Sequence, residues 1–261
     1  MLRKRLIGVV TVRRGWAVQS FGYGRWLPLG RPEVLVENLD RWGADEILLQ
    51  CTDRAGAGPD MDLLKRIGRL GLSTPLLYGG GICSVEQATA VVKAAADRIV
   101  IDALLHDAPH TVEIISKHLG AQAVVGALPV HHDGTVLQWF DYRSRRSQPL
   151  HGEAAAAVRA LFIGGVISEA MLTDWKHEGL PNAFDIRLVR EAGLPGVPLI
   201  AFGGLSEAVQ HSALLANPAV VATACGNFLA YREHAVQTLK RTFTGLPLRS
   251  PTYASDYPAA V

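Results

Sequence analysis

One motif occurs twice in this chain, at positions separated by nearly half its length. The first copy is the apolar run Pro75–Tyr78 followed by three glycines, and the second is Pro198–Ala201 followed by Phe202 and two glycines. Four further pairs share the offset of 123 positions that separates Pro75 from Pro198: Glu46 and Glu169, Asp62 and Asp185, Gly80 and Gly203, and Gly81 and Gly204. Such a repeat in a 261-residue chain indicates a duplicated half, and internal repetition usually determines the architecture.

Each copy of the motif predicts a buried strand, a tight turn and the start of a helix. Glycines in such a turn let backbone N–H groups approach an anion, and the helix N-terminus adds a favourable partial charge. The alternative is that the glycines serve only close packing at a corner of the fold.

Strand-like and helical patterns alternate along the chain. The strand-like runs are Leu6–Val12, Glu46–Thr52, Pro75–Tyr78, Arg98–Asp102, Ala121–Leu128, Glu169–Thr173, Pro198–Ala201 and Ala219–Thr223. The amphipathic helical patterns are Pro32–Gly43, Asp62–Leu70, Val85–Ala96, Thr111–Leu119, Glu153–Ile163, Asp185–Ala192 and Ala208–Ala216. The strands are rich in Val, Ile and Leu without alternation, which is typical of parallel strands covered on both faces. We therefore predict a (β/α)8 barrel over residues 1–246, built from two duplicated half-barrels, with an open doubly wound sheet as the alternative.

Two long segments, Ser20–Gly30 and His131–His151, follow the first and fifth predicted strands. Loops that follow strands lie on the catalytic face of a barrel, and long ordered loops are often lids. The second segment contains the hairpin signal Asp133-Gly134, and it also carries Arg143, Arg145 and Arg146. Each segment is either a lid or a solvated excursion. The tail 247–261, rich in Pro, Ser and Ala, is expected to be flexible.

Composition excludes several classes of function. A net charge of +2 gives no reason to expect nucleic acid or an acidic membrane as the partner. Cys51, Cys83 and Cys225 lie far apart, without metal-ligand spacing, so we expect no metal, and no cofactor either. No apolar stretch reaches membrane-spanning length and the start lacks a signal-peptide pattern, so we expect a cytoplasmic protein.

Six segments resemble the cyclase subunit of imidazole glycerol phosphate synthase. They are Leu2–Ile7, Gly43–Leu49, Tyr78–Ile82, Ala96–Arg98, Gln122–Val125 and Phe202–Gly204, and the resemblance runs in register from about Met1 to Phe228. It implies a half-barrel duplication, which agrees with the internal repeat. It also implies a separate glutaminase subunit, docked at the N-terminal face of the barrel, that supplies ammonia to a phosphorylated substrate.

The resemblance assigns an ammonia gate to the lower mouth of the barrel. Two basic and two acidic residues match the family's gate: Arg5, Glu46, Arg98 and Glu169. They fall at the starts of four predicted strands, where alternating charges can pair in a ring. The alternative is a set of ordinary salt bridges. Asp97 and Gln122 match positions at the family's glutaminase-docking face.

The resemblance assigns substrate and phosphate contacts to the upper face. The matching positions are Gln19, Gly80, Gly81, Gly179, Gly203, Gly204, Cys225 and Gly226. Several have changed: Gln19 replaces a lysine, Cys225 replaces a serine, and Asp102-Ala103 replaces Asn-Thr. A carboxylate at position 102 would repel a nearby phosphate.

The family's two catalytic aspartates are absent. The matching positions are Thr11 and Pro129, and neither side chain can act as a general acid or base near neutral pH. Thr11, Asp102 and Glu178 are the catalytic candidates, with Thr173 and Asp174 as further polar groups. The resemblance extends to divergent paralogues associated with surface-polysaccharide amidation.

We therefore expect an ammonia-using synthase subunit that aminates or amidates a phosphorylated or nucleotide-linked sugar. Ammonia is itself the nucleophile, so orientation and charge stabilisation matter more than a strong acid. Two alternatives stay open. One is a histidine-pathway cyclase with relocated acid and base, and the other is a non-catalytic scaffold that activates a glutaminase.

Overall fold

Eight parallel strands close into a barrel in the computed structural model, which describes residues 4–142, 144–150, 152–231, 235–243 and 245–248. The strands are β1 (Arg5–Arg13), β4 (Glu46–Cys51), β5 (Leu76–Gly79), β6 (Arg98–Ile101), β7 (Val124–His132), β10 (Glu169–Asp174), β11 (Leu199–Phe202) and β12 (Val220–Cys225). Each pairs with the next in chain order, β12 pairs with β1, and pairing of β7 with β10 completes the ring. The predicted (β/α)8 barrel is confirmed, and so are all eight barrel strands.

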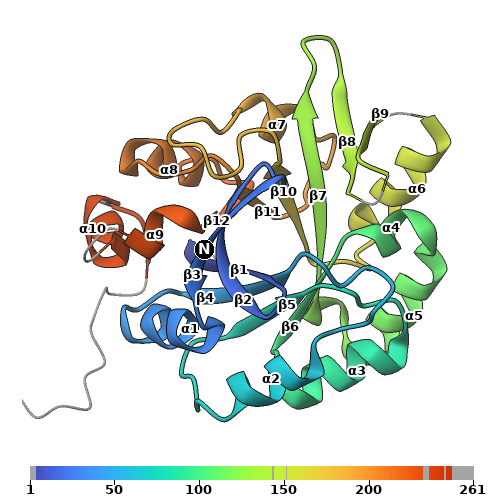
Figure 1. The fold of residues 1–261 in the computed structure, drawn as a ribbon. Helices are drawn as coiled ribbons and strands as arrows, with labels where there is room; N and C mark the ends of the chain where they lie inside the picture. Colours follow the sequence, from blue (N-terminus) through green and yellow to red (C-terminus); the bar gives the residue numbers. More distant parts are fainter. Residues whose placement is uncertain (1–3, 143, 151, 232–234, 244, 249–261) are drawn as a thin grey trace, which may run out of the picture.

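A ring of helices surrounds the barrel (Figure 1). They are α1 (Pro32–Arg41), α2 (Met61–Gly68), α3 (Val85–Ala94), α4 (Ala103–Asp107), α5 (Pro109–Leu119), α6 (Gly152–Ile163), α7 (Arg187–Glu191), α8 (Ala208–Leu215), α9 (Asn227–Tyr231) and α10 (Ala235–Thr242). The sequence did not predict α4, α9 or α10, and α4 and α9 have five residues each, too few to show helical periodicity. The strand predicted over Ala121–Leu128 begins instead with the 3-10 helix η1 (Ala121–Ala123).

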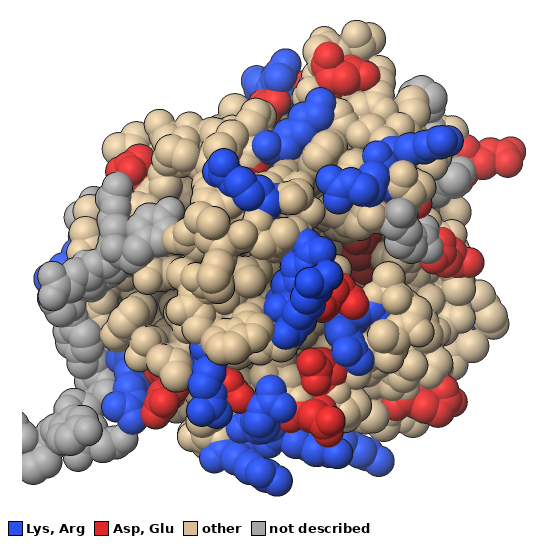
Figure 2. Space-filling view, in the orientation of Figure 1, with Lys and Arg blue, Asp and Glu red and all other residues tan. Residues whose placement is uncertain are grey.

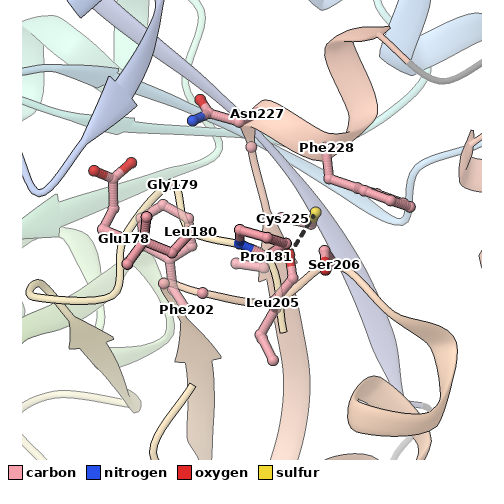
Figure 3. A pocket seen from close by; sticks show the side chains of 14 residues that line it. Glu178, Gly179, Leu180, Pro181, Phe202, Leu205, Ser206, Cys225, Asn227 and Phe228 are labelled. Carbon is pink, nitrogen blue, oxygen red and sulfur yellow. Dashed lines mark hydrogen bonds between the residues drawn. The ribbon is translucent and has the colours of Figure 1, made fainter. Parts of the chain in front are cut away.

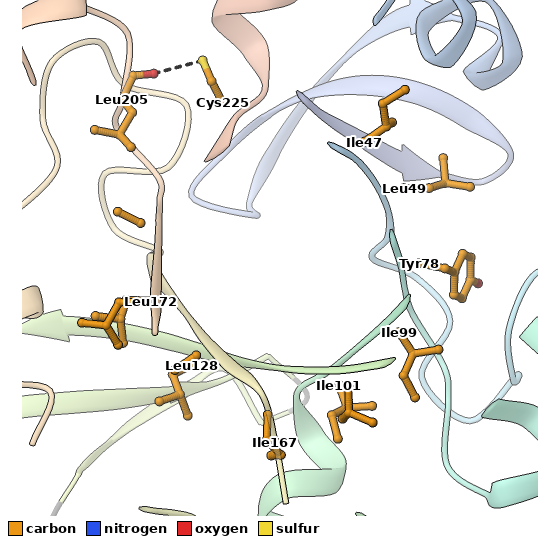
Figure 4. Packing of buried hydrophobic residues seen from close by; sticks show 14 of the residues in the cluster. Ile47, Leu49, Tyr78, Ile99, Ile101, Leu128, Ile167, Leu172, Leu205 and Cys225 are labelled. Carbon is orange, nitrogen blue, oxygen red and sulfur yellow. Dashed lines mark hydrogen bonds between the residues drawn. The ribbon is translucent and has the colours of Figure 1, made fainter. Parts of the chain in front are cut away.

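The strand side chains form two separate apolar layers because successive residues point to opposite faces. Outward-facing residues pack against the helices, as Figure 4 shows for Ile47, Leu49 and Leu128 around the ring of strands. Inward-facing residues form a second cluster inside the barrel, here called the lumen cluster. Its members are Ile7, Val9, Tyr23, Leu48, Leu77, Val100, Val125, Ala127, Met171, Ile200, Phe202, Ala222 and Ala224.

The two glycine motifs occupy equivalent places in the two halves. Gly80 and Gly203 have positive φ angles of 140° and 97° and follow β5 and β11. A Cβ at Gly80 would collide with the carbonyl of Cys51, and one at Gly203 would collide with the carbonyl of Asp174. Cys51 and Asp174 are themselves separated by the repeat offset of 123 positions. The duplication is therefore visible in the packing of the turns as well as in the sequence.

Both segments expected to be long loops contain antiparallel strands. Most of Ser20–Gly30 belongs to a hairpin of β2 (Trp16–Phe21) and β3 (Arg25–Gly30), which continues from β1. In the second segment, β7 extends to His132 and pairs with β8 (Leu137–Asp141), which pairs with β9 (Arg146–Pro149). The hairpin turn predicted at Asp133-Gly134 is confirmed, since the Asp133 N–H donates to the Val136 carbonyl.

Charges of both signs are mixed on the surface. On the face shown in Figure 2, Lys and Arg side chains lie among Asp and Glu side chains. Among the described residues, no helix is long and apolar enough to cross a membrane. Arg143 and most of the predicted tail 247–261 lie outside the described residues.

Candidate active site

The four charged residues at the strand starts form a closed ring of ion pairs. Arg5 donates to Glu46 at 2.9 Å and to Glu169 at 2.8 Å. Arg98 lies 3.4 Å from Glu46 and 3.1 Å from Glu169. All four side chains are at most 20% exposed. The lower mouth of the barrel is thus lined by alternating positive and negative groups.

One carboxylate of this ring has an oxygen to spare. Glu46 Oε2 is buried and has no hydrogen-bond partner among the described residues. Burial raises the pKa of Glu46, against the lowering effect of Arg5 and Arg98. A buried acceptor without a partner costs free energy, so a donor entering here would gain a hydrogen bond.

The two positions assigned to a docking face lie beside this ring. Both are exposed: Asp97 directly precedes β6, and Gln122 lies in η1, which precedes β7. The Asp97 carboxylate accepts from the Leu76 N–H at 2.8 Å, and the Gln122 carbonyl accepts from Arg98 Nε at 2.9 Å. Both residues therefore have a structural contact as well as an exposed surface on the face that carries the ring.

A cavity of about 270 Å³ opens at the opposite, C-terminal end of the barrel. It lies between the segments that follow β10, β11 and β12, and Figure 3 shows the side chains that surround it. Six of its lining residues are positions that the sequence assigned to substrate or catalysis: Glu178, Gly179, Gly203, Gly204, Cys225 and Gly226. Sequence analysis missed Ser206 and Asn227, which also line it. We call this cavity the upper pocket.

Three predicted substrate positions do not line the upper pocket. Gly80 and Gly81 lie at the end of β5, where Cys51 and Gly58 fill the space beside them. Gln19 is half-buried on β2, paired with Leu27 of β3. The two glycine motifs therefore share a backbone geometry, but only the second one borders this cavity.

Cys225 is a packing residue of the pocket wall. Its thiol is 1% exposed and donates to the Leu205 carbonyl at 3.3 Å. Burial raises the pKa of Cys225 to about 12, so the thiolate that nucleophilic chemistry requires is scarce near neutral pH.

Glu178 brings a carboxyl group with a raised pKa to the upper pocket. It is 3% exposed, and its Oε2 accepts from the Ser20 hydroxyl at 2.8 Å and from the Tyr23 N–H at 3.3 Å. Burial raises the pKa of Glu178 from 4.5 to about 7, although those hydrogen bonds act in the opposite direction. A carboxyl group that titrates near neutral pH is suited to general acid and base catalysis.

This raised pKa predicts how stability depends on pH. Between pH 4.5 and about 7 the Glu178 carboxyl is protonated in the native state but ionised in the unfolded state. The free energy of unfolding therefore decreases as pH rises through that window. A displacement from 4.5 to about 7 corresponds to about 3 kcal/mol. The variant E178Q should lack this loss. In denaturation experiments at a series of pH values, the free energy of unfolding of E178Q relative to that of the parent should therefore increase by about 3 kcal/mol between pH 4.5 and 8.

If the free energy of unfolding depended on pH in the same way in E178Q and in the parent, the raised pKa of Glu178 would be contradicted. Asp62→Asn is the matched control, because the Asp62 side chain is 87% exposed. The difference in free energy of unfolding between this variant and the parent should not change with pH.

The remaining catalytic candidates lie around the mouth of the barrel. Thr11 is 5% exposed on β1 and pairs in register with Gln50 of β4, while Pro129 of β7 pairs with Thr173 of β10. Asp102 comes directly before α4. Its charge, together with that of Glu178, raises the pKa of two phenols, the buried Tyr23 and the half-buried Tyr142, for which desolvation is the larger cause.

These two tyrosines are site residues that sequence analysis did not identify. Tyr23 comes from the β2–β3 hairpin and Tyr142 follows β8, and their rings meet edge to face with centroids 5.0 Å apart. Their chain separation leaves no local signal for the contact.

Asp174 has different partners from Asp102 and Glu178. Its carboxylate accepts from His177 Nδ1 at 2.8 Å and from the Asp185 N–H at 2.9 Å, at the end of β10. It is fully buried, and burial raises its pKa. Within the described part of the chain, no group of three His, Cys, Asp or Glu residues is arranged to hold a metal ion.

Comparison with known proteins agrees with this architecture. Residues 28–235 match the histidine biosynthesis protein family. A putative imidazole glycerol phosphate synthase subunit hisF2 of Vibrio vulnificus is 26% identical over 243 residues, covering 92% of this chain and 88% of that protein. The imidazole glycerol phosphate synthase subunit HisF of Thermococcus gammatolerans is 28% identical over 255 residues, covering 95% and 99%. The chain, with its closed eight-stranded barrel, belongs to the histidine biosynthesis protein family.

Proposed function

We propose that this chain is the ammonia-conducting subunit of a synthase that aminates or amidates a phosphorylated or nucleotide-linked sugar. A glutaminase docks at the N-terminal face and releases ammonia into the barrel. The observation that carries the proposal is the ring of Arg5, Glu46, Arg98 and Glu169, which closes the lower end of an apolar lumen.

The ring and the lumen favour the passage of one kind of molecule. A small polar molecule can exchange hydrogen bonds with the ring, where Glu46 Oε2 is an acceptor without a partner among the described residues. Above the ring, lumen residues such as Leu48 and Val125 offer no partner to an ion, and desolvating an ion there is costly. Neutral ammonia therefore crosses more readily than ammonium.

The upper face supports a changed reaction. Thr11 and Pro129 stand where the family's acid and base aspartates would be, so the family's cyclisation lacks its proton-transfer groups. The charges of Asp102 and Glu178 raise the pKa values of Tyr23 and Tyr142 at the mouth of the barrel. We assign proton transfer to these two carboxyl groups.

The upper pocket supports an acceptor that carries an anionic group. Backbone groups of Gly179, Gly203 and Gly226 line it, and glycine turns allow N–H groups to approach phosphate oxygens. Arg145 and Arg146 are exposed at the start of β9 on the neighbouring hairpin, where they can meet a phosphate or nucleotide.

A second candidate is the histidine-pathway cyclase itself, working through relocated acid and base groups. The family match and the names of the relatives favour it. Complementation of a histidine auxotroph that lacks its own cyclase subunit separates the two candidates. We expect no growth without histidine, because Thr11 and Pro129 cannot replace two aspartates. An authentic cyclase gene is the positive control, and rescue by this chain would establish the cyclase instead.

A further inference from the structure

Tyr23 occupies an unusual place for a residue of a hairpin turn. It is 5% exposed and belongs to the lumen cluster, whose other members come from the barrel strands. Its hydroxyl donates to Gln50 Oε1 at 3.1 Å. Gln50 lies on β4 two residues beyond the lumen residue Leu48, so it faces the same side. The ring of Tyr23 thus covers the upper end of the lumen, opposite the charged ring.

The backbone of this turn is strained in order to place the ring there. Gly22 and Tyr23 have φ angles of +57° and +51°, and the Gly24 N–H donates to the Phe21 carbonyl at 3.2 Å. Two positive φ angles define the turn type in which Asn and Gly are favoured, because a larger L-residue loses about 1–2 kcal/mol in this conformation. Strain of this kind persists where surrounding contacts over-determine it, and it concentrates at functional sites.

Residues of the upper pocket hold the strained turn in place. Glu178 accepts from the Ser20 hydroxyl and the Tyr23 N–H, and its own carbonyl accepts from the Gly22 N–H at 2.9 Å. Asn227, which also lines the pocket, exchanges two hydrogen bonds with the backbone of Ser20, at 3.0 and 2.6 Å. A molecule that binds in the pocket beside Glu178 and Asn227 therefore contacts groups that fix the turn.

The hairpin of β8 and β9 packs over Tyr23. Tyr142 meets the Tyr23 ring edge to face, with ring centroids 5.0 Å apart. A guanidinium nitrogen of Arg145 lies against Gly24, 3.6 Å from where a Cβ would be. The two hairpins therefore meet above the lumen, with Tyr23 as the innermost side chain.

We propose that Tyr23 is a movable seal at the upper end of the lumen, and that an acceptor entering the pocket beside Glu178 and Asn227 draws the turn away from Gln50. This inference rests on the proposed function, because a seal matters when ammonia travels through the barrel. Ammonia entering through the charged ring would stay enclosed until its acceptor is bound. The complex would then lose little of it to solvent.

The test uses a reporter cysteine inside the lumen of the isolated chain. Ala127 is a small lumen residue, 6% exposed, and Ala127→Cys places a thiol there. The reagent is methyl methanethiosulfonate, which is small and uncharged, and labelled sites are identified by peptide mass. Cys51 is 4% exposed and packs outside the barrel, so its labelling reports global unfolding in the same sample.

In this background, Tyr23→Gly removes the ring and also relieves the positive φ angle, so the turn itself should keep its shape. Labelling of the introduced lumen thiol should become at least about tenfold faster, because opening no longer requires a buried ring to leave. Tyr23→Phe keeps the ring, and Trp16→Ala alters an exposed residue of the same hairpin; both should stay within about twofold of the parent. Glu178→Ala should accelerate labelling, since the turn loses an anchor.

Unchanged labelling in Tyr23→Gly would overturn the proposal, and so would equal acceleration in Trp16→Ala. If Cys51 labels in parallel in Tyr23→Gly, Tyr23→Asn, which also tolerates the left-handed conformation, decides by the same criterion. The readout needs neither a glutaminase nor an acceptor. A failure here would therefore leave the proposed ammonia transfer standing, and a failure of ammonia transfer would not affect this result.

Discussion

Replacing Glu46 with alanine should uncouple glutamine hydrolysis from product formation and should destabilise the fold. Arg5 and Arg98 both contact Glu46, so its loss leaves two largely buried guanidinium groups sharing Glu169. Breaking a buried ion pair by removing one partner costs about 3–5 kcal/mol, because the remaining charge is left uncompensated. The ring would also lose the acceptor oxygen that we assign to ammonia entry.

Two measurements on the E46A variant test this expectation. Chemical denaturation gives the change in the free energy of unfolding. In the complex with its glutaminase, the ratio of glutamate released to aminated product should rise well above that of the parent. Glu37→Ala is the matched control, because Glu37 pairs with Arg41 on the exposed surface of α1 and such a pair contributes about 0.3–0.5 kcal/mol. Unchanged coupling in E46A would remove the ring from the account of ammonia transfer.

Replacing Gly203 with alanine should lower stability by about 2–5 kcal/mol, from the cost of a positive φ angle plus that of a steric clash. The φ angle of Gly203 is 97°, and an added Cβ would meet the backbone of Asp174. Backbone atoms at the end of a barrel strand cannot move aside as a flexible side chain can. Gly80→Ala should show a similar loss, since Gly80 has the equivalent contact with Cys51 in the other half.

Gly71→Ala separates the two contributions. Gly71 also has a positive φ angle, 64°, but nothing among the described residues lies within 4 Å of the position of its Cβ. It should therefore lose only about 1–2 kcal/mol from the backbone conformation. Denaturant-induced unfolding of the three variants measures these differences, and an equal loss in all three would show that the strand-end contacts contribute nothing.

The barrel could be predicted from sequence because its signals are local or periodic. Short runs rich in apolar residues identify each barrel strand, and the offset that relates Gly80 to Gly203 indicates two equivalent halves. The glycines and aromatic residues of Ser20–Gly30 predict an irregular loop. Its regularity depends instead on contacts with residues far away in the chain, such as Glu178 and Asn227.

The candidate site was only partly predictable for the same reason. Resemblance indicated Glu178 and the glycines of the upper pocket, which the structure places around one cavity. It gave no reason to choose Tyr23 or Tyr142, whose meeting requires two hairpins to fold over the same strand ends. It also suggested Gly80 and Gly81 as substrate contacts, although Cys51 and Gly58 occupy the space beside them.

The central claim is that ammonia reaches the acceptor through the barrel without mixing with solvent. The most direct test supplies the complex of this chain and its glutaminase with glutamine whose amide nitrogen is isotopically labelled, in an excess of unlabelled ammonium. Passage through the lumen predicts that the product carries mainly the labelled nitrogen in the parent and mainly the unlabelled nitrogen in E46A. A product from the parent that carries the diluted label of the bulk solution would contradict the account.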